Sequence, residues 1–163
     1  MAAPRPEVAI SVATAADGDE IASVYLASRA DALAHLRRTR DDAQDRAWIK
    51  ETVLSRGTTW VAREGAQIVG FLTLVGSDVD QLYLRPGHYR RGIGSRLLDH
   101  ARSASPNHMH LYTFQCNARA RAFYEAHGFR AARFGDGTLN EECEPDIYYE
   151  WHVPAGLGQP QGD

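Results

Sequence analysis

The chain has 163 residues, 44% of them hydrophobic and 24% charged, which fits one globular domain with its own core. Its formal net charge is −3, so basic residues are not in excess, which argues against a nucleic-acid-binding protein. Two cysteines without a CxxC spacing argue against a disulfide scaffold or a zinc ribbon. No stretch approaches the ~18–20 apolar residues of a membrane span, and the start lacks the apolar core of a signal peptide. We therefore expect a cytoplasmic protein without nucleic-acid or membrane partners.

Two capping boxes organise the first third of the chain. A short strand is expected over residues 8–13, and a capping box from Thr14 to Asp17 then begins a helix. A second capping box at residues 39–42 begins another helix, which Gly57 is placed to end. Apolar residues follow at helical spacing in both segments: Ile21, Val24 and Tyr25 in the first, and Trp48, Ile49 and Val53 in the second.

The period then changes to that of strands. Residues 58–62 and 68–75 flank the turn Glu64-Gly65, which predicts an antiparallel hairpin, and residues 78–85 predict a third strand. The remaining elements alternate: a helix from Gly92 to before Pro106, a strand at 109–116, a helix at 118–127, and closing strands at 129–134 and 147–151. The order β-α-α-β-β-β-α-β-α-β-β predicts an α/β layer structure with a mixed sheet. We expect a single domain over residues 8–152, with disordered termini at 1–7 and 153–163.

The densest signal is the segment from Leu82 to Leu98, where a strand runs through a turn into a helix. Gly92 and Gly94 stand at the start of that helix, whose first turn has unpaired N–H groups and the positive end of the helix dipole. Such a site suits a phosphate or pyrophosphate, with added charge from Arg90 and Arg91. The alternative is a tight strand–helix turn with solvated arginines.

Two motifs in order resemble the GNAT superfamily of N-acetyltransferases. Residues 86–98, P-G-H-Y-R-R-G-I-G-S-R-L-L, resemble its coenzyme A signature, and residues 117–129 resemble its second motif, N-x-x-A-x-x-F-Y-x-x-x-G-F. The family pattern begins with Gln or Arg where this chain has Tyr89, which puts a side-chain contact from that position in doubt. The resemblance covers residues 8–151 and implies a mostly antiparallel twisted sheet flanked by helices, with acetyl-CoA as cosubstrate.

The resemblance also implies roles for individual residues. The backbone of the strand before the loop would bind the pantetheine arm, the loop would hold the pyrophosphate, and an asparagine would contact the cofactor arm. The cofactor-binding residues are then Leu82, Tyr83, Leu84, Arg90, Arg91, Gly92, Ile93, Gly94, Ser95 and Asn117. No metal is expected, because His108 and His110 are the nearest approach to a ligand pair and zinc needs three or four ligands.

Tyr124 matches the family's general acid, since a phenol can protonate a departing thiolate. The alternative is a half-buried helix aromatic. Asp80 lies two residues before Leu82, so strand alternation places both on one face, and Asp78 follows the same pattern. Asp80 is the first candidate for the base and Asp78 the second, and water in a solvated turn is the alternative to both.

We expect the acceptor to be a primary amine of a small molecule or peptide. Residues 140–146 include four carboxylates, which would favour a cationic amine if they cover the acceptor cleft. A plain solvated loop is the alternative. The lack of a basic or extended peptide-binding feature favours a small molecule. His35 lies where the family usually builds acceptor specificity. The competing function is a catalytically weak acyl-CoA-binding sensor, and a homodimer is left open.

Overall fold

The computed structural model describes residues 2–155, so that residue 1 and residues 156–163 lie outside the described part. The disorder expected for the two termini falls partly outside it, and residues 2–7 and 153–155 contain no helix or strand. Within the described range, no helix is both long and apolar enough to cross a membrane.

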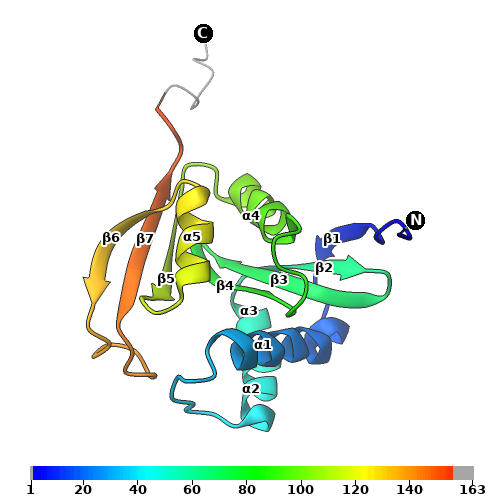
Figure 1. Cartoon of the computed structure of the whole chain (residues 1–163), viewed down its shortest axis with the longest axis horizontal. Coiled ribbons are helices and arrows are strands. Elements are labelled where there is room, and N and C mark those ends of the chain that lie inside the picture. The colour runs from blue at the N-terminus through cyan, green and yellow to red at the C-terminus, as the bar shows by residue number, and fades with distance from the viewer. Residues whose placement is uncertain (1, 156–163) are drawn as a thin grey trace.

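One sheet runs through the described residues in the strand order β1-β2-β3-β4-β5-β7-β6 (Figure 1). All neighbouring strands are antiparallel except β4 and β5, which are parallel. The strands are β1 (Val8–Val12), β2 (Thr58–Glu64), β3 (Gln67–Val75), β4 (Asp78–Leu84), β5 (His108–Phe114), β6 (Arg130–Gly135) and β7 (Asp146–His152). The predicted α/β class, the mostly antiparallel sheet and the order of elements are confirmed.

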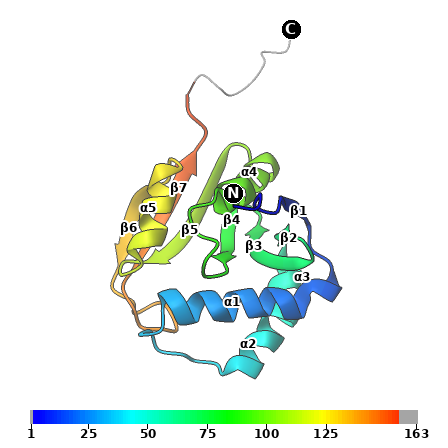
Figure 2. The ribbon, with the colours of Figure 1, turned by 45° about the vertical axis from the view of Figure 1, so that its right-hand side comes forward.

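Helices cover both faces of this sheet (Figures 1 and 2). α1 packs on β3 and β4 from one side, while α4 packs on β2 and β3 from the other, together with α5. The core is divided into two clusters, one on each face of the sheet. Side chains of β2 alternate between them, so Trp60 and Ala62 face the α4 side and Val61 faces the α1 side. The helices are α1 (Gly18–Ala32), α2 (Asp42–Trp48), α3 (Leu54–Arg56), α4 (Ile93–Ala104) and α5 (Ala118–Ala126), with a π-helical turn (Ile49–Val53) joining α2 to α3.

The two predicted helix starts differ in their outcome. At the first, the Asp17 carboxylate accepts hydrogen bonds from the N–H and hydroxyl of Thr14, at 2.8 and 3.3 Å. The second start was predicted at residues 39–42 and is wrong by two positions. α2 begins at Asp42, and its capping box is formed by Asp41 and Gln44. The Asp41 carboxylate accepts from the Gln44 N–H at 2.8 Å, and the Gln44 side-chain oxygen accepts from the Asp41 N–H at 2.9 Å. The hydroxyl of Thr39 instead donates to Glu141, 3.2 Å away.

Candidate active site

The candidate site opens where two neighbouring strands diverge. β4 and β5 pair only at Asp78 and His110, so Leu82–Leu84 have no strand partner on the β5 side. Such an edge offers backbone N–H and C=O groups to a ligand. A cleft of about 660 Å³ follows this edge between α1, β4, the start of α4 and α5. Its lining includes Tyr124 and every predicted cofactor-binding residue except Arg91, namely Leu82, Tyr83, Leu84, Arg90, Gly92, Ile93, Gly94, Ser95 and Asn117.

The turn into α4 has a backbone shaped for an anion. Arg90 and Gly92 both have positive φ angles, 57° and 77°, in the left-handed region that glycine adopts without strain. The N–H groups of the first helical turn point out of the helix start with no partner inside it. A Cβ at Gly94 would lie 3.2 Å from the Phe123 ring, so a glycine lets α4 and α5 approach closely. This corner of the cleft can hold phosphate oxygens.

The two arginines of the turn behave differently. Arg90 is exposed and lines the cleft. Arg91 instead donates to Glu64 at 2.6 Å and does not line the cleft. Its side chain therefore ties the turn to β2, and the phosphate contact predicted for it has no support from its placement.

The side chain of Tyr124 is buried and borders the cleft. Its ring packs edge-on against Phe123 and Phe129, with ring centroids 5.3 and 5.6 Å away. Among residues 2–155, no group is hydrogen-bonded to its hydroxyl. Burial raises the pKa of Tyr124 above its ordinary value, so the phenol keeps its proton at neutral pH. A protonated, unpaired phenol in a cleft has the properties of a general acid.

Tyr83 lines the same cleft as Tyr124, and its ring contacts Tyr25 with ring centroids 5.1 Å apart. Burial first, and then the nearby charges of Tyr25, Tyr124 and Glu142, raise the pKa of Tyr83, while Arg29 opposes the shift. Arg29 and Glu142 form an ion pair at 3.4 Å with both side chains mostly buried. This carboxylate of the acidic segment is therefore already paired with a residue of α1, and it does not line the cleft.

The two aspartates predicted as bases do not line the cleft. The alternation argument fails at Asp80, because Gln81 pairs with Thr73 and Val79 pairs with Leu74, which leaves Asp80 as the extra residue of a β-bulge. Asp80 accepts a hydrogen bond from Arg56 at 3.5 Å, and Asp78 lies 3.8 Å from His110. The structure therefore does not bring either aspartate together with Tyr124.

Sequence reasoning missed one wall of the cleft. Ser28, Ala32 and Leu33 line it from α1 and its end. Asp31 accepts a hydrogen bond from Tyr89 at 3.1 Å and lies 3.5 Å from Arg119, whose guanidinium stacks 4.1 Å above the Tyr89 ring. Tyr89 thus contacts α1 and α5 through its side chain. The apolar periodicity of α1 predicts which of its residues are buried. It does not predict that the C-terminal end of α1 contacts the turn before α4, which lies far along the chain.

A family model described as "Acetyltransferase (GNAT) domain" matches residues 55–131. Peptidyl-lysine N-acetyltransferase YiaC of Escherichia coli is 30% identical over 111 residues, which are 67% of this chain and 73% of YiaC. The probable N-acetyltransferase Rv2775 of Mycobacterium tuberculosis is 35% identical over 96 residues, 50% of this chain and 55% of Rv2775, so the chain matches little more than half of that relative.

Solved structures share the fold. YjaB of Escherichia coli in its apo form has a TM-score of 0.75 at 24% identity, covering 89% of this chain and 97% of YjaB. The PaiA N-acetyltransferase of Thermoplasma acidophilum, solved in complex with coenzyme A, has a TM-score of 0.67 at 19% identity. The match covers 90% of this chain and 99% of PaiA. Together with the matched motifs, these similarities show that the chain belongs to the GNAT family of acetyltransferases.

Proposed function

We propose that this protein transfers the acetyl group of acetyl-CoA to a primary amine by direct attack within a ternary complex, using one domain over residues 8–152. The observation that carries the proposal is the unpaired Tyr124 hydroxyl in a cleft that also presents an open strand edge and the start of α4. These features supply a proton donor, backbone partners for an extended arm and an anion site in one cavity.

Each part of the cofactor has a partner in the cleft. The free edge of Leu82–Leu84 pairs with the pantetheine arm, and the first turn of α4 binds the pyrophosphate, with Arg90 beside it. Asn117 caps α5, because its side-chain oxygen accepts a hydrogen bond from the Ala120 N–H at 3.2 Å. Its amide NH₂ group remains available to donate to a carbonyl of the cofactor arm.

The reaction then follows from the placement of Tyr124. The neutral amine attacks the thioester carbon, the C–N bond forms, and the C–S bond breaks as the tetrahedral intermediate collapses. Tyr124 donates its proton to the departing thiolate and regains one from solvent, which leaves an amide and free coenzyme A. Because Asp78 and Asp80 lie outside the cleft, we assign removal of the amine proton to water.

We propose the ε-amine of a peptide lysine as the acceptor in preference to a small molecule. Support comes from YiaC and YjaB of Escherichia coli, both called peptidyl-lysine N-acetyltransferases, which are 30% identical to this chain over 73% and 76% of their lengths. A lysine amine is mostly protonated at neutral pH, with a pKa of about 10.4, so the enzyme works on the minor neutral form.

Calorimetric titration with acetyl-CoA, followed by thiol release with lysine peptides and with small amines, tests the proposal. Saturable binding with peptide-dependent release supports it. Binding without release from any amine favours the sensor function, and no binding at all contradicts the proposal.

Tyr124→Phe separates chemistry from binding. The variant should lower kcat about 100-fold, the usual lower range for general acid–base catalysis, while the acetyl-CoA Kd stays within about twofold. Tyr112→Phe is the control, because Tyr112 is exposed and does not line the cleft. An unchanged kcat in Tyr124→Phe removes the acid role.

A further inference from the structure

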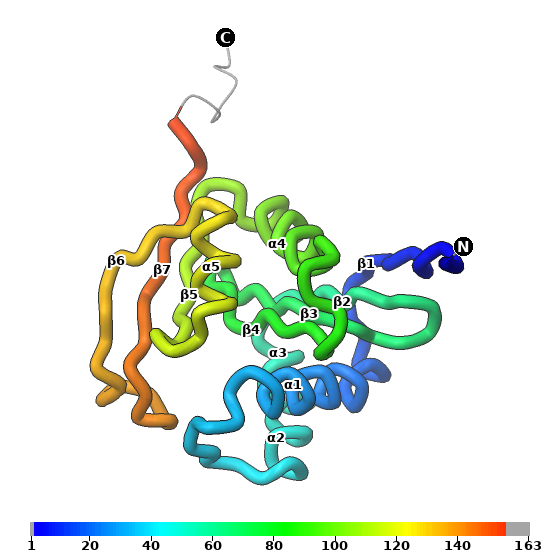
Figure 3. Tube along the Cα trace, in the orientation of Figure 1, coloured from blue at the N-terminus to red at the C-terminus, as the bar shows by residue number. Residues whose placement is uncertain are grey.

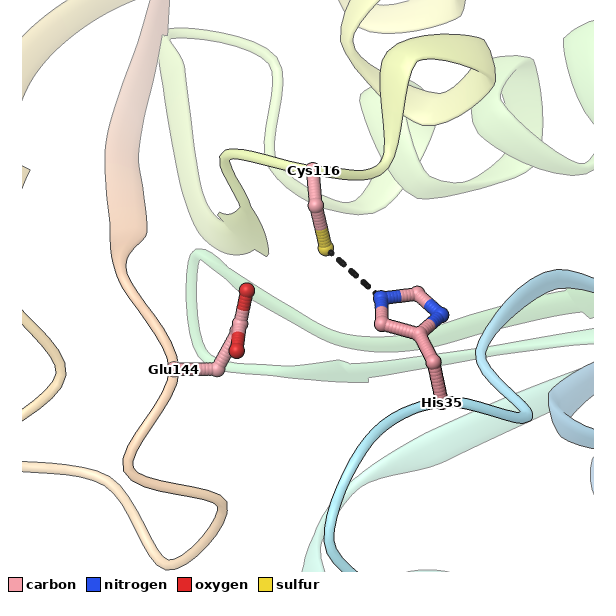
Figure 4. Close-up of side chains that lie close together, drawn as sticks. All are labelled: His35, Cys116 and Glu144. Atoms are coloured by element: carbon pink, nitrogen blue, oxygen red, sulfur yellow. Dashed lines mark hydrogen bonds between the residues drawn. The ribbon is translucent and has the colours of Figure 1, made fainter.

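Three metal-ligating side chains converge beside the cleft, from parts of the chain that lie far apart in sequence. His35 lies in the α1–α2 connection, Cys116 between β5 and α5, and Glu144 between β6 and β7. Figure 4 shows the Cys116 thiol, the His35 ring and the Glu144 carboxylate directed toward a common point. Their ligand atoms all lie within 4.8 Å of one another.

The spacing of two of these ligands matches that of a bound zinc ion. The Sγ of Cys116 lies 3.5 Å from Nε2 of His35. Zinc–sulfur and zinc–nitrogen bonds of about 2.3 and 2.0–2.1 Å, at a tetrahedral angle, place the two ligand atoms about 3.5 Å apart. The present separation of these two atoms therefore suits an ion bound to both.

The third ligand supplies negative charge that no basic side chain offsets. Glu141 and Glu142 form ion pairs with Arg40 and Arg29, at 3.2 and 3.4 Å. In the described part of the chain, no Lys, Arg or His side chain lies within 4.0 Å of the Glu144 carboxylate. The single thiol proton of Cys116 can satisfy just one of its two neighbours, whereas a cation satisfies all three groups.

The loops that hold the ligands are already fixed in position. The α1–α2 and β6–β7 connections lie side by side (Figure 3) and are joined by the Arg40–Glu141 pair, while Arg29 of α1 holds the β6–β7 connection through Glu142. Asn140 holds the backbone of Glu144 from both sides, since its amide donates to the Glu144 carbonyl at 2.8 Å and its side-chain oxygen accepts from the Glu144 N–H at 3.2 Å. A metal ion would thus bind to a largely formed site.

We propose that His35, Cys116 and Glu144 bind a divalent transition-metal ion of the zinc class, with water as the fourth ligand. A thiolate, an imidazole and a carboxylate form a donor set that zinc accepts. On binding, the S–H bond of Cys116 breaks, its proton goes to solvent and a metal–sulfur bond forms, without any change of oxidation state. The site goes beyond the proposed acetyl transfer and does not depend on it. Cys116 directly precedes the cleft-lining Asn117, so the ion would link three segments of the chain next to a cleft residue.

Titration of the untagged chain with Co²⁺ tests this site, because a cobalt–thiolate bond gives a charge-transfer band in the near ultraviolet. We expect one ion per chain, the band, and its loss when Zn²⁺ displaces the cobalt. Cys116→Ser should abolish the band. Cys143→Ser is the control and should retain it, because Cys143 is also a free, exposed thiol but is not one of the proposed ligands. His35→Ala and Glu144→Gln should each weaken Zn²⁺ binding by more than about 10-fold, since even outer-shell changes cost that much.

Three outcomes overturn the proposal. The first is the absence of stoichiometric binding, and the second is a charge-transfer band that survives Cys116→Ser or disappears in Cys143→Ser. The third is binding without any thiolate band, which would place the metal on side chains other than Cys116, for which the stacked histidines His108, His110 and His152 are the first to test. Far-ultraviolet circular dichroism of each variant verifies folding, and Glu144→Gln gives a second readout that leaves the thiol in place.

Discussion

At the scale of single residues, Gly92 and Gly87 provide a matched pair for testing the anion site. Both have positive φ angles, 77° and 89°, and a Cβ at either position meets nothing within 4 Å. Replacement by Asp therefore strains the backbone similarly at both, but only Gly92 lines the cleft. Gly92→Asp should raise the acetyl-CoA Kd by at least about 10-fold, or about 1.4 kcal/mol, because its carboxylate repels the phosphates.

Gly87→Asp should leave that Kd within about threefold, and calorimetry of both variants measures the difference. Equal weakening by the two substitutions would mean that backbone strain in the turn, not charge at the start of α4, controls cofactor binding. Tight binding by both variants would place the phosphates elsewhere.

The structure places some of the predicted site residues in one cleft and others outside it. Gly92, Asn117 and Tyr124 belong to fixed motifs, and their placement in one cleft agrees with the motif spacing. Asp80 was predicted from ideal strand alternation, which a β-bulge interrupts at this residue. Arg91 was predicted from charge alone, and its partner Glu64 lies on a strand 27 residues earlier in the chain. Contacts of this kind depend on the tertiary fold.

At the scale of elements, the α1–α2 connection is organised around one buried carboxylate. Asp45 is 3% exposed and accepts hydrogen bonds from Arg38 and Arg40, both at 2.8 Å. Asp45→Ala should lower the free energy of unfolding by about 2–3 kcal/mol, because two charged hydrogen bonds are lost and the arginines lose their partner. Urea unfolding monitored by circular dichroism measures the change.

Asp42 is the control for this prediction. It pairs with Arg38 at 2.8 Å from an exposed position, with a side chain that is 68% exposed. Asp42→Ala should therefore cost less than about 1 kcal/mol. If both substitutions cost the same, burial of Asp45 has no special role in holding the connection.

Most of the helices and strands could be predicted, because hydrophobic periodicity persists over a whole element. The exception is the second helix, predicted as one element up to Gly57, which the structure divides into α2, a π-helical turn and α3. The ends could be predicted less well, because capping depends on which side chain reaches the free amides first. Thr39 and Asp41 both precede α2, and the carboxylate of Asp41 takes the cap while Thr39 bonds to Glu141 in a distant loop. The prediction of Thr39 as the cap was wrong because its partner Glu141 lies about 100 residues away, where the local sequence gives no sign of it.

At the scale of the whole molecule, the sheet consists of two parts that diverge. β1–β4 form one part and β5–β7 the other, and the single β4–β5 pairing at Asp78 and His110 joins them along their shared edge. The order of elements indicates a mixed sheet, but it does not show that two adjacent parallel strands separate after one pair. The cleft is a consequence of that separation, so its volume could not be predicted from the chain.

Because the cofactor is expected to occupy this gap, its binding should stabilise the molecule unevenly. At a free acetyl-CoA concentration of 100 times the Kd, the free energy of unfolding should rise by about 2.7 kcal/mol. Hydrogen exchange followed by mass spectrometry should slow at Leu82–Leu84 and at Gly92–Ser95, whose backbone amides lie along the cleft. Exchange in β1, at the far edge of the sheet, should change little beyond the global effect. Protection confined to β1 and β2, or protection that persists unchanged in Gly92→Asp, would show that the cofactor binds outside the gap.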